Sequence, residues 1–275
     1  MKKKADFNNL LAPALVVLLV VASFLAGSLW TKIRGLEEER VKITKEAQPT
    51  NPPAAPTRPP FTPKKSEKPV VKFFVMAFCP FGNQAETGLE PVCQLLKNKV
   101  DWQPRYVIYK DYCERTPADQ KAKCEKDYCF KKGSKIYCSM HGVAELNQDI
   151  RELCAFNLEG AEKFWKFVSS TNKNCNVSNI ETCWKTEAKN AGLNIAKIEN
   201  CFSSQKFALA KVQTEEMDKY RAFGSPAVFI NDVSYEGGRA PEDYKKAICS
   251  SFENPPEECQ KVLGQESEAV AGGCN

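Results

Sequence analysis

Apolar and polar positions after residue 69 predict two short strands on either side of one helix. The segment from Val70 to Phe78 is rich in β-branched and aromatic residues and is bounded by prolines, which predicts a buried strand. The residues that follow, up to Lys99, have a helical pattern apart from Pro91. A second strand pattern runs from Trp102 to Tyr109, so the three elements predict a β-α-β unit with parallel strands.

A second group of elements is predicted near the end of the chain. A turn with Ser225-Pro226 leads into a strand of apolar β formers that ends at a hairpin turn near Asp232. Val233 to Tyr235 is the expected returning strand, and Pro241 to Phe252 the last helix. Between the two groups, residues of about 110–222 have mostly helical patterns. The predicted fold class is therefore α/β, with β-α-β and β-β-α halves and a helical, cysteine-rich insertion.

The amino-terminal part has the pattern of an anchor and a tether. The run from Leu10 to Trp30 carries no charge and would be about 31 Å long as a helix, which matches a bilayer core. Lysines at positions 2–4 predict a cytoplasmic amino end. A cleaved signal peptide, with Ala26-Gly27-Ser28 as its cleavage site, is the alternative. We expect this division of the chain: 1–9 cytoplasmic, 10–30 transmembrane, 31–69 charged and then proline-rich linker, 70–252 folded domain, 253–275 tail.

Charge and cysteine content narrow the possible functions. The net charge is +5, but the basic excess lies in residues 1–69 and the remainder is near neutral, so nucleic-acid binding is not expected. Thirteen cysteines indicate an oxidising compartment, and we expect the folded part to be extracytoplasmic. His141 is the single histidine, so catalysis that needs two histidines is excluded.

The candidate nucleophile is Cys79, which falls between the first strand and the first helix. Pro80 suits the first turn of a helix, so Cys79 lies at the helix N-terminus, where backbone N–H groups and the helix dipole favour a thiolate. Thiolates are the nucleophiles of disulfide exchange. We also expect Cys79 to be a surface thiol that contributes little to packing.

These residues resemble the thioredoxin fold, and the helical insertion is similar to that of the periplasmic disulfide-bond (Dsb) family. The segment from Cys138 to Gly142, with Asn147 and Cys154 beyond it, is similar to the gamma-interferon-inducible lysosomal thiol reductase, although the Glu-Cys pair of that family is missing. The resemblance implies that the peptide bond before Pro226 is cis and that Pro226 faces Cys79. It also implies that the backbone beside Pro226 pairs with a substrate peptide. From the residues alone, an ordinary trans turn at Ser225-Pro226 stays open.

One position departs from the resemblance. Thioredoxin-like oxidoreductases have a second cysteine where this chain has Gly82, so the motif Cys79-Pro80-Phe81-Gly82 has one thiol. Cys93 would lie about 21 Å further along the helix and cannot replace the missing cysteine. Three routes stay open: an isomerase, an external thiol or redox partner that resolves the mixed disulfide, or a resolving cysteine from the insertion.

The other cysteines are candidates for structural disulfides. Cys79 is expected to remain a thiol, while Cys93 and Cys274 are weak partners. A zinc site built from the first four candidates and His141 is the less favoured alternative, so we expect no metal. The candidates are Cys113, Cys124, Cys129, Cys138, Cys154, Cys175, Cys183, Cys201, Cys249 and Cys259.

Together these observations predict a membrane-anchored, extracytoplasmic thiol-disulfide oxidoreductase or isomerase that acts on cysteine-containing proteins. Cys79 is the expected nucleophile, and Pro80, Phe81, Gly82, Ser225 and Pro226 are expected to shape its surroundings. We expect no cofactor. The alternative is a thioredoxin-like binding or chaperone module without catalysis, in which disulfides stabilise the fold and the same groove holds a partner.

Overall fold

The structure is a computed structural model that describes residues 31–32 and 61–264. The chain divides into two compact parts, Met1–Pro59 and Pro60–Asn275, and of the first part only the helical residues 31–32 are described. Within the described ranges no helix is both long and apolar enough to cross a bilayer. The predicted anchor at 10–30 lies outside the described residues.

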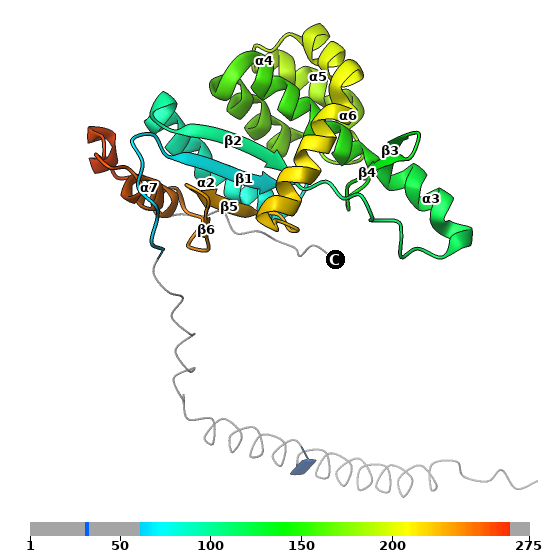
Figure 1. The fold of residues 1–275 in the computed structure, drawn as a ribbon, viewed down its shortest axis with the longest axis horizontal. Helices are drawn as coiled ribbons and strands as arrows, with labels where there is room; N and C mark the ends of the chain where they lie inside the picture. Colours follow the sequence, from blue (N-terminus) through cyan, green and yellow to red (C-terminus); the bar gives the residue numbers. More distant parts are fainter. Residues whose placement is uncertain (1–30, 33–60, 265–275) are drawn as a thin grey trace, which may run out of the picture. The chain divides into compact units, whose positions relative to one another are not determined.

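A four-stranded sheet with strand order β2-β1-β5-β6 forms the base of the second part (Figure 1). β1 and β2 are parallel and are joined by α2, while β5 pairs antiparallel with both β1 and β6, and α7 follows β6. This arrangement confirms the predicted β-α-β and β-β-α halves. The elements are β1 Val70–Val75, α2 Pro80–Leu96, η1 Lys97–Lys99, β2 Asp101–Tyr106, β5 Ala227–Ile230, β6 Val233–Tyr235, α7 Pro241–Ser250 and η2 Glu257–Gln260.

The insertion between β2 and β5 contains a helical group and a small hairpin (Figure 1). α4 packs against α5 and α6, and both α4 and α6 contact β2. Gly160, with φ of 78°, interrupts α4, a backbone conformation that glycine adopts without a steric penalty. The elements are α3 Ala118–Tyr128, β3 Cys129–Lys132, β4 Lys135–Cys138, α4 Val143–Asn174, α5 Ile180–Asn190 and α6 Ile195–Tyr220.

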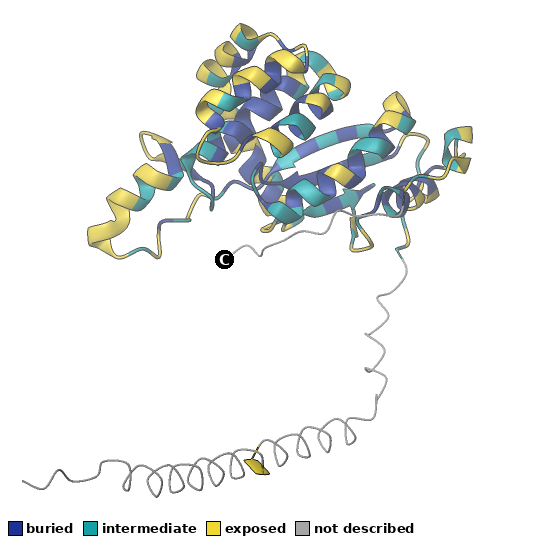
Figure 2. Ribbon diagram, turned by 180° about the vertical axis from the view of Figure 1, so that it is seen from behind, coloured by how far each residue is buried: buried dark blue, intermediate teal, exposed yellow. Residues whose placement is uncertain are grey.

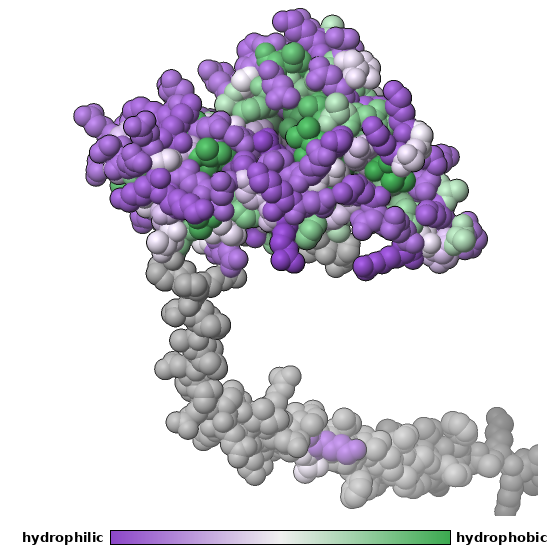
Figure 3. Space-filling view, in the orientation of Figure 1, coloured by the Kyte–Doolittle hydropathy of each residue, from purple (hydrophilic) through white to green (hydrophobic). Residues whose placement is uncertain are grey.

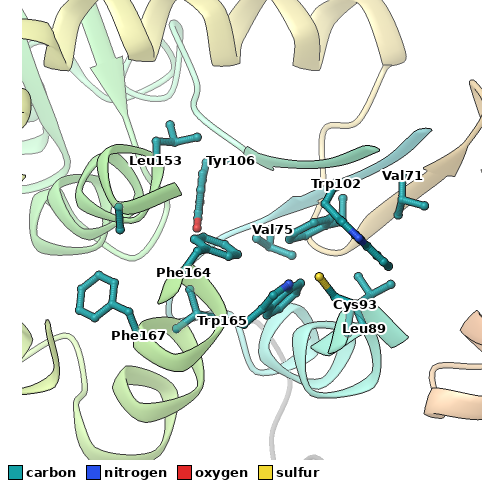
Figure 4. Packing of buried hydrophobic residues seen from close by; sticks show 14 of the residues in the cluster. Val71, Val75, Leu89, Cys93, Trp102, Tyr106, Leu153, Phe164, Trp165 and Phe167 are labelled. Atoms are coloured by element: carbon teal, nitrogen blue, oxygen red, sulfur yellow. The ribbon is translucent and has the colours of Figure 1, made fainter. Parts of the chain in front are cut away.

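The main hydrophobic core lies between the sheet, α2 and the insertion helices (Figures 2 and 4). The Phe73 ring stacks on Trp165 with centroids 5.3 Å apart, which joins β1 to α4. Gly88 on α2 allows close approach of α7, because a Cβ there would lie 2.8 Å from the Tyr244 ring. On the face of the folded body in Figure 3, hydrophilic side chains predominate and apolar side chains form smaller patches among them.

The folded body extends beyond both ends of the expected 70–252 domain. Phe61 packs edge-to-face on Tyr235 with ring centroids 5.3 Å apart, and Ser66 forms a bridge with Phe252. At the other end, the Cys249–Cys259 disulfide and η2 hold the chain against α7. The expected linker therefore ends before Phe61, and residues 253–264 are part of the packed body rather than a tail.

Candidate functional site

Cys79 is the residue immediately before α2, at the end of the turn that follows β1. Its backbone is extended, with φ of −77° and ψ of 118°, and its N–H donates to the Met76 carbonyl at 3.0 Å. Pro80 occupies the first helical position, where the lack of an N–H does not remove a helical hydrogen bond. The local structure thus places the Cys79 thiol at a helix N-terminus, as the sequence predicts.

Cys79 is more deeply buried than we expected. Only 1% of the residue is exposed, and it packs with Phe74, Met76, Val107 and Met217 in a small second core cluster. The expectation of a surface thiol is therefore wrong.

The Ser225-Pro226 segment lies directly against Cys79. The peptide bond between Ser225 and Pro226 is cis. The Cys79 thiol donates to the Ser225 carbonyl, with Sγ and O 3.5 Å apart. The Ser225 hydroxyl in turn accepts from the Met76 N–H at 3.1 Å. Two hydrogen bonds, each between a side chain and a backbone group, thereby connect the Cys79 segment to the Ser225 segment, and Cys79 and Ser225 are 146 residues apart in the sequence.

Gly82 lies under the same serine. A Cβ at position 82 would lie 2.5 Å from Ser225 Oγ, 3.3 Å from the Met76 carbonyl oxygen and 3.5 Å from Cys79 Cβ. A separation under 3 Å is too short for a Cβ carbon and an oxygen that are not bonded to each other. The Ser225 hydroxyl therefore occupies space that any side chain at position 82 would need.

A hollow of about 380 Å³ opens beside this loop. Its walls come from Phe81 at the start of α2, from Arg239, and from the segment that links α6 to β5 (residues 221–227). The Arg239 guanidinium lies 5.6 Å from the centroid of the Phe81 ring, within the range of a cation–π contact. Phe223, which also lines the hollow, is 54% exposed, which is unusual for so large an apolar side chain. The hollow thus combines aromatic and cationic groups.

Two buried carboxylates of α4 bind the turn that precedes Cys79. Glu145 Oε1 accepts from the Phe78 N–H at 2.8 Å, and Asp149 Oδ1 accepts from the Ala77 N–H at 3.0 Å. His141 Nδ1 lies 2.8 Å from Glu145, and this hydrogen bond raises the pKa of the histidine. The insertion thus fixes the backbone next to the candidate nucleophile.

More acidic groups lie behind this pair. The Tyr106 hydroxyl donates to Glu152, and the amide of Gln148 donates to the same carboxylate at 2.9 Å. Glu86 on α2 accepts from the Asn172 amide at 2.7 Å. Burial raises the pKa of Glu152 to about 7 and raises the pKa of Glu86 well above its usual value. Burial likewise raises the pKa of Asp149.

The sequence prediction did not include this acidic cluster. Glu145, Asp149 and Glu152 follow one another at helical spacings of four and three residues, so they share one face of α4. This face borders the apolar stripe of Leu146 and Ile150, which is the signal that could have identified the three acids as buried.

The ten candidate cysteines form five disulfides. Cys113, Cys124, Cys129 and Cys138 are therefore disulfide sulfurs, not the thiolates that the zinc alternative needs, while Cys79 and Cys93 lie outside the five bonds. His141 faces Glu145, and Asn147 donates to exposed Glu181 at 3.0 Å rather than to the site. The pairs are Cys113–Cys124, Cys129–Cys138, Cys154–Cys201, Cys175–Cys183 and Cys249–Cys259.

Cys93 is remote from the candidate site and poorly suited to exchange. It lies on α2 in the main core, where burial raises the pKa of its thiol to about 12. Its neighbours Trp102 and Trp165 are visible with it in Figure 4. A thiol that stays protonated at neutral pH is a poor nucleophile.

Comparisons with known proteins found similar solved structures and one matching family model. Solved structures similar to the chain include disulfide bond oxidoreductase DsbG from Mycobacterium tuberculosis in its reduced form (17% identity, TM-score 0.46, covering 71% of this chain and 88% of that one). BdbD from Bacillus subtilis is 12% identical, with a TM-score of 0.44 over 68% of this chain and 88% of that one. DsbA from M. tuberculosis is 15% identical, with a TM-score of 0.44 over 71% of this chain and 93% of that one.

No curated protein sequence matches the chain. The family model of the vacuolar sorting receptor thioredoxin-like domain matches residues 87–249, a range that begins after Cys79 and Gly82 and ends within α7. The match includes most of α2, the whole insertion and the hairpin of β5 and β6. The chain therefore belongs to the family of the vacuolar sorting receptor thioredoxin-like domain.

Proposed function

We propose that this protein is a thiol-disulfide oxidoreductase or isomerase in which Cys79 is the single nucleophile. The observation that carries the proposal is the position of the Cys79 thiol, at the N-terminus of α2 and 3.5 Å from the Ser225 carbonyl oxygen. In the proposed reaction, the Cys79 thiolate attacks one sulfur of a substrate disulfide to give a mixed disulfide.

The proposed substrate is an extended polypeptide that carries a cysteine. The hollow beside Ser225 is bordered by Phe81 and by the half-exposed Phe223, which provide apolar surface for the residues that flank the substrate sulfur. The backbone around Pro226 lies next to Cys79 and offers a strand-like edge to a peptide. Because only 1% of Cys79 is exposed, the proposed reaction requires that groups around its sulfur move aside as the peptide enters.

A binding module without catalysis is the second candidate. Two observations favour it: Cys79 is only 1% exposed, and the Ser225 hydroxyl fills the space beside Gly82 where a second sulfur would be needed. In that case the same hollow would hold a partner segment through apolar and cationic contacts, and the Cys79 side chain would only fill space in the core.

We further propose that the domain functions outside the cytoplasm, held at the membrane by residues 10–30. Five disulfides support an oxidising compartment, and the uncharged run with lysines before it supports an anchor with a cytoplasmic amino end. Protease treatment of intact cells would then release the domain, whereas full protection of the domain would contradict this topology.

A refolding assay tests the activity. The full chain is mixed with a small protein whose disulfides have been scrambled, in a glutathione buffer, and recovery of the native substrate is followed. We expect Cys79→Ser to reduce the rate to the buffer background and Cys93→Ser to retain the wild-type rate, since Cys93 lies in the core away from the hollow. Equal rates for the wild type and Cys79→Ser would support the binding module instead.

A further inference from the structure

The residues that line the hollow beside Ser225 carry charge of one sign. Arg221 and Arg239 are the charged residues among them, and the other lining residues are uncharged. Both cations are arginines, whose planar guanidinium matches the geometry of a carboxylate and can bind it through two parallel hydrogen bonds. The hollow is therefore suited to a ligand that carries a carboxylate.

The two arginines of the hollow are not committed to carboxylates of the described chain. Within the described ranges, the arginines that form ion pairs are Arg105 and Arg151. Asp218 lies three residues before Arg221 in the sequence, but it pairs with Lys110, with Oδ2 and Nζ 2.6 Å apart. A carboxylate that enters the hollow would therefore not have to displace an existing ion pair of either arginine.

Arg239 is held beside the first turns of α2. Its Nη1 donates to Gln84 Oε1 at 3.0 Å, and its guanidinium carbon lies 5.6 Å from the centroid of the Phe81 ring. Phe81 and Gln84 are two and five residues beyond Cys79. A guanidinium has five N–H donors, so the bond to Gln84 leaves donors for a ligand. These contacts orient the arginine before a substrate arrives, which lowers the entropy lost on binding.

Arg221 comes from a different part of the fold. It follows the last residue of α6 in a left-handed conformation, with φ of 54° and ψ of 34°, and its N–H donates to the Asp218 carbonyl at 3.2 Å. It also begins the segment 221–227, which lines the hollow and contains the half-exposed Phe223. Each arginine of the hollow thus has an aromatic residue near it in the lining, Phe81 or Phe223.

We propose that the hollow selects substrate polypeptides that carry an acidic residue within two residues of the reactive cysteine. Arg221 and Arg239 are the residues that determine this specificity. The inference rests on the proposed exchange at Cys79 and names its substrate class. Phe81, against which Arg239 lies, is two residues from Cys79, and an extended substrate advances by about 3.3–3.6 Å per residue. A side chain one or two residues from the substrate sulfur therefore falls beside the lining of the hollow.

The test uses short peptides whose single cysteine carries thionitrobenzoate, together with the full chain at neutral pH. The peptides differ in the two residues on each side of the cysteine, which are glutamate, glutamine or lysine. The Cys79 thiol gives its proton to the buffer and its sulfur attacks the peptide sulfur. The bond to thionitrobenzoate breaks, and thionitrobenzoate leaves as a thiolate. Mass analysis without reductant, at a series of times, gives the rate at which each peptide becomes attached to Cys79.

The expected order of rates is glutamate, then glutamine, then lysine. At an ionic strength of about 0.01 M, the glutamate peptide should react faster than the glutamine peptide by a factor of about five, and at about 1 M salt by a factor below about two. Glutamine has nearly the shape of glutamate without its charge, so the ratio of these two rates isolates the contribution of the carboxylate.

Variants of the two arginines are judged by the same ratio. Arg239→Gln and Arg221→Gln should each bring it closer to one, and Arg221→Glu should shift the preference toward the lysine peptide. Arg115→Gln is the matched control, since Arg115 is exposed and does not line the hollow, and should retain the wild-type ratio. Arg221 is exposed as well, so its variants test the proposal even where Arg239→Gln fails to fold.

The outcomes separate this inference from the function on which it rests. If all three peptides attach to Cys79 at equal rates, exchange at Cys79 stands and the acidic specificity is wrong. A preference for glutamate that survives both arginine variants would also contradict the assignment of Arg221 and Arg239. If no peptide becomes attached to Cys79, the proposed function itself is wrong, and the specificity is wrong with it.

Discussion

The hydroxyl of Ser225 lies where a side chain on Gly82 would have to be. A Cβ at position 82 would be 2.5 Å from Ser225 Oγ but 3.5 Å from Cys79 Cβ. The second distance is at the short end of the range found in disulfides, roughly 3.5–4.5 Å. The backbone therefore retains the spacing for a two-cysteine site, while Ser225 blocks it.

This relationship predicts a coupled effect of two substitutions. Gly82→Cys alone should lower the free energy of unfolding by about 1–3 kcal/mol, because the new side chain is forced against Ser225. Combining it with Ser225→Ala should recover part of that loss and allow a disulfide between residues 79 and 82 on oxidation. Urea unfolding of both single variants and the double variant measures the coupling. Additive losses, with no new disulfide by mass, would show that Ser225 does not block the position.

Glu152 should make stability depend on pH. Burial raises its folded-state pKa to about 7, above an unfolded value of about 4.5. The stabilising contribution is therefore complete below about pH 4.5 and is lost as pH rises through about 7, with an upper limit of about 3.4 kcal/mol.

The matched variant for this prediction is Glu152→Gln, which keeps the shape of the side chain. Tyr106 can still donate to the new amide, and the buried Gln148 oxygen, which has no partner, can accept from it after its amide rotates. The variant should gain stability relative to the wild type between pH 4.5 and 7.5. Parallel stability curves for the two proteins over this range would contradict the buried-acid assignment.

The two halves of the sheet were predictable from the sequence because their residues obey simple patterns. The returning strand Val233–Tyr235 and the start of the last helix at Pro241 have the predicted positions. Their apolar runs are short and bounded by turn residues and prolines, so tertiary contacts had little to override. The first strand is shorter than predicted, since Met76 to Phe78 form the turn that binds α4.

Other features depend on contacts that no local pattern encodes. The hairpin of β3 and β4 is rich in lysine, and it forms where the Cys129–Cys138 disulfide joins its two strands. Glu145 and Asp149 have the composition of an exposed helix face, yet they are buried because they satisfy the N–H groups of a turn 67 and 72 residues away. The burial of Cys79 depends likewise on the distant Ser225 loop.

The disulfides should contribute unequally to stability. Cys154–Cys201 closes a loop with a sequence separation of 47, and Cys175–Cys183 one of 8. In the chain-entropy model their contributions are about 4 and about 2.6 kcal/mol, respectively. Replacing both cysteines of the first pair by alanine should therefore lower the free energy of unfolding more than the same change in the second pair.

The effects of a reductant and of a metal chelator on the melting temperature distinguish the disulfides from the zinc alternative. A reductant should lower the melting temperature, while a chelator should leave it unchanged, because the cysteines from 113 to 138 are disulfide-bonded. Stoichiometric zinc in the freshly purified protein, lost together with stability on chelation, would contradict the disulfide assignment and restore the zinc alternative.

Alkylation of the native protein tests the role of Cys79 most directly. The full chain is treated with iodoacetamide at neutral pH without reductant, then unfolded and labelled with a second, heavier reagent before mass analysis. We expect Cys79 to carry the first label and Cys93, whose thiol pKa is raised to about 12 by burial, to carry the second. If Cys79 is labelled only after unfolding, it is a packing residue, and the proposed exchange at this site is wrong.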